Sequence, residues 1–307
     1  MLLAVVGICH WFATDMDKTL VFYDAAMPTS IALPASSGTG KVGHVAVETL
    51  QLLDSITQRG TRVICVSGQR ASTMLQRAPY FPSIKFWVCE GGSRLFVRDE
   101  GGQLLEDYAF AERIYAASGI SEPSQYRTDL ETLRNFGSEL ESSGHRVDTN
   151  GLQAMLRVKV DNAVVIEGIL ATLPARLRHT FNLGYLDITL APIDKKSAIV
   201  QVIADHSATQ TGGYVFMGDD DNDLTAAQHS LEAFIARPCS SGMRSWLATL
   251  GVPASFLEDD KNGEESNPTI SVNTGLPRPK TVTIPSHRRE NHEGCIALLR
   301  RFIETQD

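Results

Sequence analysis

The sequence lacks a basic surplus, a long apolar run and a regular cysteine pattern, and each absence excludes a class of protein. Its 307 residues hold 28 Lys and Arg against 36 Asp and Glu, a net charge of −8. A nucleic-acid-binding protein that neutralises phosphates normally shows the opposite balance. No run of 18 apolar residues occurs, so a membrane-spanning helix is not expected. We therefore expect neither a nucleic acid nor a membrane as a partner.

Cysteine is sparse, and its spacing argues against zinc sites and a disulfide framework. Five cysteines lie far apart and mostly within apolar runs: Cys9, Cys65, Cys89, Cys239 and Cys295. This pattern is typical of reduced, buried thiols in a cytoplasmic protein. The apolar segment 1–11 lacks a basic region and a small-residue cleavage site, so it is expected to be a strand that enters the core. The sequence thus predicts a cytoplasmic protein.

Apolar runs alternate with helical periodicity over the first hundred residues. Apolar residues at nearly helical spacing predict a helix over 42–58, and Arg62–Val66 is a β-branched run typical of a buried strand. A short helix over 71–77 and a strand over 84–89 follow. Successive strand–helix units imply a parallel sheet with right-handed crossovers. We predict an α/β fold whose core is a Rossmann-like, doubly wound parallel sheet.

The middle of the chain has a different pattern. A polar helix is expected over 123–143, and the elements after it include strands that alternate apolar and polar residues. Such alternation is typical of an antiparallel sheet with one wet face. The expected elements are a strand over 155–160, a helix over 162–173 and strands over 180–183 and 186–190. The sequence predicts an α+β insert here.

These patterns divide the chain. We predict a core made of 1–105 and 188–307, interrupted by an α+β cap domain over 106–187. The stretch 259–292 is rich in Asp, Asn, Pro and Ser, so we expect a long flexible loop there. An amphipathic helix over 295–303 closes the core.

Four short polar motifs stand at predicted strand ends or at a helix start. They are Asp15-Met16-Asp17-Lys18-Thr19, Ser67-Gly68, Asp194-Lys195-Lys196 and Gly218-Asp219-Asp220-Asp221-Asn222-Asp223. Each alone also has an ordinary structural interpretation, as a solvated turn, a helix start or an N-cap. Their order and shared position favour a functional site, because ligands bind at the carboxyl ends of parallel strands.

Several carboxylates in one crevice need a positive partner. Those concerned are Asp15, Asp17, Asp219 and Asp223. They would raise one another's pKa, and a hard divalent cation such as Mg²⁺ removes that cost. A phosphate adds further negative charge, which Lys195 can balance while Ser67 and the Gly68 amide donate hydrogen bonds. An ionised aspartate beside Mg²⁺ and a lysine is a feasible nucleophile toward phosphorus. The partner we expect is a small phosphorylated molecule.

These motifs resemble those of the haloacid dehalogenase (HAD) superfamily of phosphatases. The family's Asp-x-Asp-x-Thr motif is matched at 15–19, its strand-end serine at Ser67, its lysine best at Lys195, and its Gly-Asp-x-x-Asn-Asp motif at 218–223. The insert between the second and third motifs resembles the type-2 cap of subclass IIB, which includes sucrose-phosphate, trehalose-phosphate and mannosyl-phosphoglycerate phosphatases. The resemblance implies Mg²⁺-dependent hydrolysis of a sugar or polyol phosphate.

The resemblance also implies a role for each motif residue. Asp15 would be the nucleophile, and Asp17 the general acid that afterwards activates water. The implied Mg²⁺ ligands are Asp15, the Asp17 carbonyl and Asp219. The implied phosphate-binding residues are Ser67, Gly68, Lys195 and Asn222. Thr19, Asp220 and Asp223 would support these groups from behind, with Asp223 orienting the lysine or a metal-bound water.

Three positions depart from the family pattern. Lys196 replaces a glycine, so either Lys195 or Lys196 can face the phosphate, and Asp220 adds a charge where glycine is common. The segment 90–92 reads Glu-Gly-Gly where relatives have Asn-Gly. A phosphomutase and a non-catalytic sensor of a phosphorylated ligand remain alternatives. Neither the oligomeric state nor the residues that set specificity are predicted.

Two basic residues of the insert are candidates for contacting the leaving group. Arg157 and Lys159 alternate on one predicted strand, so their side chains share a face. The other interpretation is a solvated strand face opposite the core.

Overall fold

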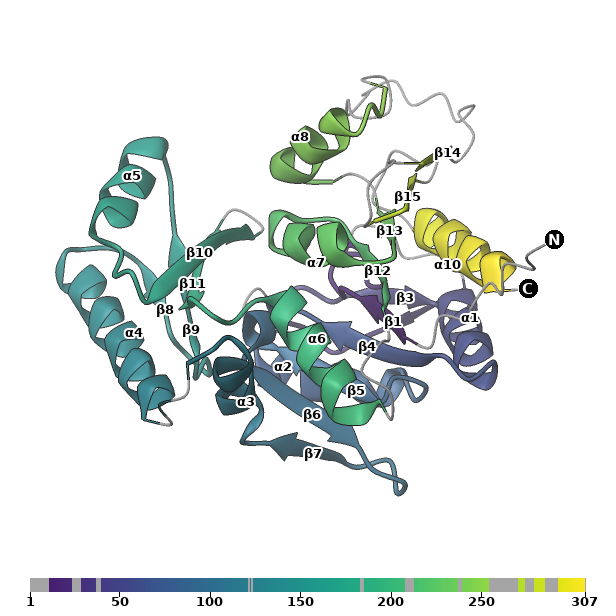
Figure 1. The fold of residues 1–307 in the computed structure, drawn as a ribbon, viewed down its shortest axis with the longest axis horizontal. Helices are drawn as coiled ribbons and strands as arrows, with labels where there is room; N and C mark the ends of the chain where they lie inside the picture. Colours follow the sequence, from purple (N-terminus) through teal and green to yellow (C-terminus); the bar gives the residue numbers. More distant parts are fainter. Residues whose placement is uncertain are drawn as a thin grey trace.

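A nine-stranded sheet forms the centre of the part of the chain that the structure describes (Figure 1). The structure is a computed structural model, and it describes residues 11–23, 29–36, 40–120, 122, 124–182, 185–207, 213–236, 239–253, 270–273, 279–284 and 292–306. From edge to edge the strands are β14 (Ile270–Asn273), β15 (Thr281–Ile284), β13 (Glu232–Ile235), β12 (Val215–Gly218), β1 (Trp11–Thr14), β4 (Arg62–Val66), β5 (Phe86–Cys89), β6 (Arg94–Arg98) and β7 (Leu104–Asp107).

The central strands of this sheet are parallel. The run β15-β13-β12-β1-β4-β5 pairs in parallel, whereas β14, β6 and β7 pair antiparallel at the two edges. The chain builds β1, β4 and β5 toward one edge and later returns to build β12 and β13 on the other side of β1. The strand order therefore reverses beside β1, at the place where open sheets of this kind bind ligands.

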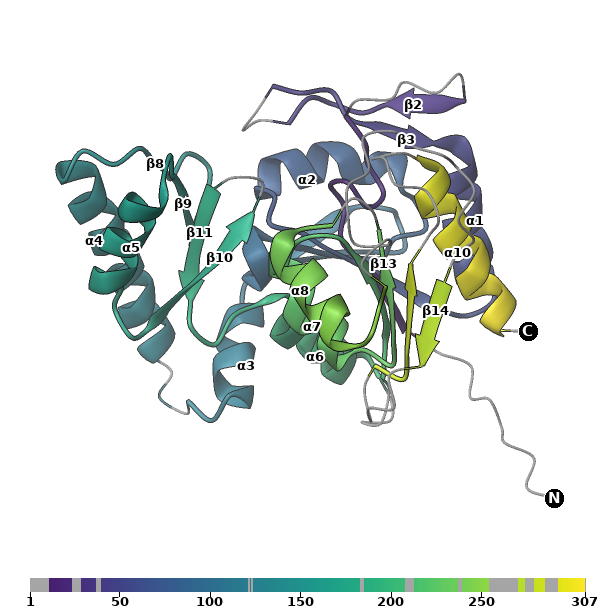
Figure 2. The ribbon, with the colours of Figure 1, turned by 90° about the horizontal axis from the view of Figure 1, so that it is seen from above.

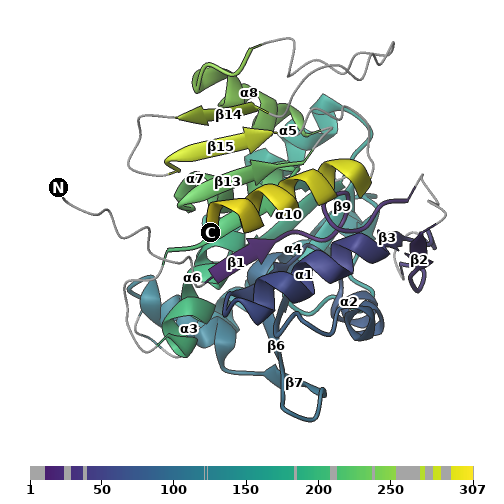
Figure 3. The same cartoon turned by 90° about the vertical axis from the view of Figure 1, so that its right-hand side faces the viewer.

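Helices cover both faces of the sheet because the side chains of its strands alternate. In β1, Phe12 packs in one core, while Trp11 and Ala13 pack in the other. The Phe12 core takes residues from α1 (Val47–Gln58), α2 (Ala71–Arg77) and α10 (His292–Gln306), and Figure 3 shows α1 and α10 side by side. The Trp11 core takes residues from α3 (Phe110–Ala117), α6 (Lys195–His206), α7 (Leu224–His229) and α8 (Ser241–Thr249). The predicted doubly wound α/β core is confirmed.

A second, four-stranded sheet stands beside the main one (Figures 1 and 2). It is antiparallel, with the order β10 (Leu177–Asn182), β11 (Tyr185–Leu190), β9 (Met155–Lys159) and β8 (Val147–Asp148). Leu156 and Val158 of β9 are buried in a core that includes residues of α4 (Gln125–Ser142) and α5 (Ala163–Thr172). We call this sheet with α4 and α5 the small lobe. Its antiparallel α+β composition is as predicted.

The edges of the predicted insert differ from the edges of the two sheets. β7 pairs with β6 and so extends the main sheet to Asp107, whereas β11 extends the small sheet to Leu190. Helix α3 packs against α6 on the main sheet. Strand pairing decides these edges, and a single sequence does not show pairing. The division into a core and a cap domain at 106 and 187 stays a prediction.

The expected flexible loop over 259–292 is wrong where the structure describes this stretch. β14 and β15 pair with each other, and β15 joins the parallel sheet beside β13. Val282 and Ile284 are buried in the sheet core. Each of these strands is only four residues long and lies in a polar, proline-rich segment, so the sequence pattern does not reveal it. Residues 259–269, 274–278 and 285–291 lie outside the described residues.

Two smaller expectations have mixed outcomes. The helix expected from residue 42 begins only at Val47, because β3 (His44–Ala46) pairs with β2 (Ser30–Ala32). The four described cysteines are buried and form no disulfide with one another, as predicted, and Cys9 lies outside the described residues with the rest of 1–10. Among the described helices, none has the length and apolarity to cross a bilayer.

Candidate active site

The four motifs meet at one edge of the main sheet. Asp15 follows β1, Ser67 follows β4 and Asp219 follows β12, while Lys195 is the first residue of α6. These strands are parallel neighbours, so their carboxyl ends lie together beside the strand-order reversal. A backbone hydrogen bond of 2.8 Å from Asp15 N to Met217 O ties the first motif to β12. Parallel topology thus assembles residues that are far apart in sequence.

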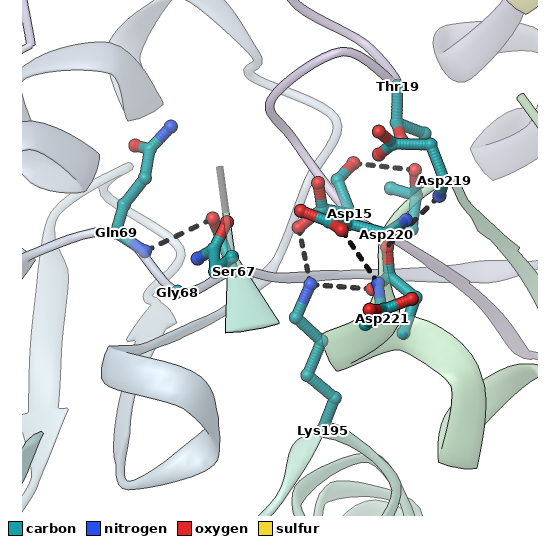
Figure 4. Close-up of polar contacts among 12 residues, drawn as sticks. Asp15, Thr19, Ser67, Gly68, Gln69, Lys195, Asp219, Asp220 and Asp221 are labelled. Atoms are coloured by element: carbon teal, nitrogen blue, oxygen red, sulfur yellow. Dashed lines mark hydrogen bonds and ion pairs between the residues drawn. The ribbon is translucent and has the colours of Figure 1, made fainter. Parts of the chain in front are cut away.

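Lys195 is the cation that contacts the acidic residues (Figure 4). Its Nζ lies 2.7 Å from Asp15 Oδ1 and 2.6 Å from Asp223 Oδ1, and the residue is 1 % exposed. Burial lowers the pKa of the ammonium, but the two carboxylates outweigh burial and raise it. The N-cap Asp194 accepts a 2.7 Å hydrogen bond from Ser197 N and so fixes the start of α6. The structure places Lys195, rather than Lys196, between the carboxylates.

Both carboxylate oxygens of Asp223 accept hydrogen bonds. Its Oδ1 accepts from Lys195, and its Oδ2 accepts from the backbone N–H groups of Asp219 (3.0 Å) and Asp220 (3.1 Å). A Cβ on Gly218 would lie 2.7 Å from Asp223 Oδ2, so the turn needs glycine there. Asp223 therefore holds Lys195 and the turn after β12 in place.

The carboxylates at this edge outnumber the ammonium that contacts them. Asp15, Asp219 and Asp223 are buried, and one oxygen of each lies within 4.8 Å of the others. Burial raises the pKa of Asp15 to about 8; Lys195 opposes this shift, and Asp223 and Asp17 add to it. Burial and the neighbouring carboxylates also raise the pKa of Asp219, although Thr19 Oγ1 donates to it at 3.0 Å. Clustered oxygen donors with excess negative charge suit a hard divalent cation such as Mg²⁺.

The side chain of Asp17 lies outside this cluster. Its Oδ1 accepts hydrogen bonds from Tyr23 OH and, at 3.2 Å, from Arg77 Nη1. Arg77 is fully buried and also donates to Tyr23 OH at 3.0 Å. Burial and the nearby Asp17 raise the pKa of Tyr23, so the phenol stays protonated. Sequence reasoning missed Tyr23 and Arg77, because an arginine ending a short helix normally looks like a solvated residue.

Of the four predicted phosphate-binding residues, Gly68, Lys195 and Asn222 line one pocket, and Ser67 precedes Gly68. Ser67 is buried, and its Oγ accepts from Gln69 N at 3.2 Å (Figure 4). A Cβ on Gly68 would lie 2.6 Å from Asn182 Nδ2 of the small lobe, so glycine permits that close approach. Asn222 Oδ1 is buried and has no hydrogen-bond partner among the described residues. An acceptor left unpaired in this way is typical of a site that a ligand or water completes.

A small pocket, with a cavity volume of about 20 Å³, lies between the main sheet and the small lobe. Gly68, Lys195 and Asn222 line it from the main sheet. From the small lobe it is lined by Met155, Arg178, Thr180, Asp187 and Thr189. The small lobe therefore faces the carboxyl edge of the main sheet with mostly polar side chains.

The charged side chains of the small lobe at or beside the pocket are paired with one another or with the main sheet. Arg157 donates to Asp187 through Nε at 2.6 Å and Nη2 at 2.7 Å, and Nη2 also donates to Gly68 O at 3.2 Å. Asn182 Nδ2 donates to Asp187 at 3.0 Å. Lys159 instead has a largely exposed side chain, 3.9 Å from Asp161. Of the two basic candidates, Arg157 reaches the site.

The comparisons with known proteins support this fold. No protein-family model matches the chain, and no curated protein matches its sequence. A solved Thermoplasma acidophilum protein is similar with a TM-score of 0.53 and 11% identity, covering 78% of this chain and 89% of that one. The sucrose-phosphatase of Synechocystis, solved with sucrose and phosphate, is similar with a TM-score of 0.53 and 14% identity, covering 80% and 89%. A structure from a phosphoryl-transfer superfamily is similar with a TM-score of 0.51 and 12% identity, covering 77% of this chain and 90% of that one.

At these identities, similarity of structure shows a common fold. The resemblance drawn from the motifs is confirmed at that level: the chain has the fold of HAD superfamily phosphatases.

Proposed function

We propose that this chain is a Mg²⁺-dependent phosphatase that hydrolyses a phosphate monoester of a sugar or related polyol through an aspartyl-phosphate on Asp15. The observation that carries the proposal is the buried pair of Asp15 Oδ1 and Lys195 Nζ, 2.7 Å apart, beside Asp219 at the strand-order reversal. A carboxylate nucleophile, an ammonium for the phosphoryl oxygens and a further carboxylate for a cation are the parts this reaction needs.

The residues present fit Mg²⁺. Asp15 and Asp219 would hold it with side-chain oxygens, and the Asp17 carbonyl is the third ligand that the family pattern supplies. Asp223 is less suited to this task, because both of its oxygens already accept hydrogen bonds. Bound Mg²⁺ would balance the clustered carboxylates and polarise the phosphoryl group.

The reaction has two steps on this chain's own residues. In the first step, a carboxylate oxygen of Asp15 attacks phosphorus, and the bond from phosphorus to the ester oxygen breaks. Asp17 gives its proton to the departing alkoxide. In the second step, Asp17 takes a proton from water and the water oxygen attacks phosphorus. The bond from phosphorus to the Asp15 oxygen breaks, which restores the carboxylate, and inorganic phosphate leaves. Both contacts to Asp17 fall on Oδ1, so Oδ2 is the oxygen suited to carry the proton.

The small lobe would act as the cap that selects the leaving group. It presents two threonine hydroxyls, the Asp187 carboxylate and the Arg178 guanidinium to the pocket. Hydroxyl and charged groups of this kind can form further hydrogen bonds to the hydroxyls of a leaving group. The polarity of the pocket therefore favours a sugar or polyol. The sucrose and phosphate found in the structurally similar sucrose-phosphatase support the same class.

Phosphate release from a panel of esters tests the proposal. The panel contains sucrose phosphate, glucose 6-phosphate, glycerol phosphate and p-nitrophenyl phosphate, each with Mg²⁺ or EDTA. We expect Mg²⁺-dependent release by the wild type, its loss in Asp15→Asn, and unchanged release in the surface control Asp161→Asn. No release from any ester, or undiminished release by Asp15→Asn, would refute it. Phosphate moved within a sugar phosphate without release would identify a phosphomutase instead.

A further inference from the structure

Glu90 is a buried acid that the reaction above does not use. It directly follows β5, it is 0 % exposed, and its backbone φ is +52°. The next two residues, Gly91 and Gly92, also have positive φ, at 68° and 121°. A glutamate in the left-handed region is uncommon and persists only where surrounding contacts determine it. The contacts of this turn therefore indicate what the residue does.

The two carboxylate oxygens of Glu90 have different partners. Oε2 accepts from the backbone N–H groups of Gln153 (2.8 Å) and Ala154 (3.0 Å), directly before β9 of the small lobe. Oε1 accepts from Arg94 Nη1 at 2.9 Å, and Arg94 also donates to both oxygens of Glu106, at 2.8 and 3.0 Å. Arg94 balances the buried charge, which leaves the second oxygen to hold the small lobe.

The backbone of the same turn binds residues 67–69, which include the proposed phosphate-binding residues Ser67 and Gly68 and which we call the phosphate loop. Glu90 N donates to Gln69 O at 2.9 Å, and Gly91 N donates to Ser67 O at 3.1 Å. Gly91 also lies against the small lobe, because a Cβ there would be 3.4 Å from Thr189 Cγ2. One turn thus binds the phosphate loop through its main chain and the start of β9 through one side chain.

We propose that Glu90 is a positioning residue that sets the small lobe over the phosphate loop. Strand β9 begins next to the two amides that Glu90 holds, and it carries Arg157, whose Nη2 donates to Gly68 O at 3.2 Å. Anchoring the start of β9 therefore places Arg157 and its partner Asp187 against the pocket where the leaving group would lie. This inference rests on the proposed phosphatase function.

Two substitutions and one matched control test the proposal. Glu90→Asn suits a left-handed backbone but is one methylene shorter, and Glu90→Gln keeps the length but removes the charge. Glu106→Gln alters the other carboxylate on Arg94 and leaves the amides of Gln153 and Ala154 untouched. The measurements are hydrogen exchange of these two amides, circular dichroism to establish folding, and kcat and KM for sucrose phosphate and p-nitrophenyl phosphate.

We expect both Glu90 variants to fold, with exchange at Gln153 and Ala154 at least tenfold faster than in the wild type. Their kcat/KM for the preferred ester should fall at least tenfold, mainly through KM, while Glu106→Gln stays within threefold in both readouts. Unchanged exchange would show that Glu90 does not anchor β9. Faster exchange with unchanged kcat/KM would show an anchor without a positioning role. If the wild type hydrolyses no ester, the proposed function fails, whereas the exchange data still decide whether Glu90 is the anchor.

Discussion

The carboxyl end of the main sheet and the side of the small lobe that faces it differ in how their charges are balanced. Among the described residues of the main sheet, three buried carboxylates cluster together and Lys195 contacts two of them, while burial and mutual repulsion raise the pKa of Asp15 and Asp219. On the small lobe, Arg157 pairs with Asp187 through two hydrogen bonds, and Arg178 pairs with Asp194 at 2.7 Å. Here each charge has a partner of opposite sign.

This difference separates the chemistry of the site from its selectivity. Unbalanced buried carboxylates are unfavourable by themselves, so this end of the main sheet suits a bound cation, as the proposed phosphatase requires. Paired charges need no further ion. They offer fixed hydrogen-bonding groups, and the small lobe therefore suits recognition of a polar leaving group. Substitutions on the two sides should affect different kinetic constants.

Loss of Lys195 should have the largest effect. Lys195→Met leaves the buried carboxylates of Asp15 and Asp223 without their cation, so we expect kcat/KM to fall about a thousandfold and stability to fall by about 3 kcal/mol. The matched control is Lys196→Met, which should stay within threefold in kcat/KM. Phosphate-release kinetics and urea unfolding measure both. Equal losses in the two variants would contradict the placement of Lys195.

Asp17→Asn should have the second-largest effect on activity. It removes the proposed proton donor while an amide oxygen can still accept from Arg77 and Tyr23, so kcat for a sugar phosphate should fall about 10²–10⁴-fold. The loss should be much smaller for p-nitrophenyl phosphate, because p-nitrophenolate leaves without a proton. Tyr23→Phe, which removes one hydrogen bond to Asp17, is the milder comparison. An equal loss for both esters would argue against a proton-donor role.

On the small lobe, Arg157→Met should raise KM about tenfold and change kcat little. The reason is that the proposed contact of Arg157 to the leaving group would already exist before the reaction begins. Lys159→Met, on the same strand but with a largely exposed side chain, should leave both constants unchanged. Steady-state kinetics with the best ester of the panel measure this. A fall in kcat with unchanged KM would assign Arg157 to the chemical step.

A further prediction concerns the pH dependence of stability rather than catalysis. Burial raises the pKa of Asp15 from 3.8 to about 8 without metal, so across this window the folded protein keeps a proton that the unfolded chain has lost. Stability in EDTA should therefore fall as pH rises from about 4 to 8, and then level off. Urea unfolding at pH 5 and pH 8 measures the difference. Asp15→Asn, which cannot titrate, should show a weaker fall; an identical slope would contradict the raised pKa.

The sequence alone allowed us to predict that most of the motif residues gather at one edge of the main sheet, because they belong to short local motifs. Asp15, Ser67, Lys195 and Asp219 follow strands or start a helix, and parallel topology brings such positions together. The Arg77–Asp17 contact and the Glu90 contacts to 153–154 could not be predicted, because they join segments about 60 residues apart with no shared pattern. The choice between Lys195 and Lys196 needed the helix start that Asp194 fixes.

The remaining errors have a similar origin. The pattern of β14 and β15 is too short to stand out from polar surroundings, and only pairing with β13 makes β15 a strand. In the same way, the edges of the small lobe depend on which strands pair, at Asp107 and at Leu190. Local patterns predict elements; they do not predict long-range partners.

Calorimetric titration of the metal-free protein with Mg²⁺ at pH 7 tests the central claim most directly. With the pKa of Asp15 at about 8, we predict that one Mg²⁺ binds per chain with release of a proton, seen as a dependence of the heat on buffer ionisation enthalpy. Asp219→Asn should abolish binding, and Asp161→Asn should preserve it. Absence of Mg²⁺ binding by the wild type, or equal binding by Asp219→Asn, would contradict the account.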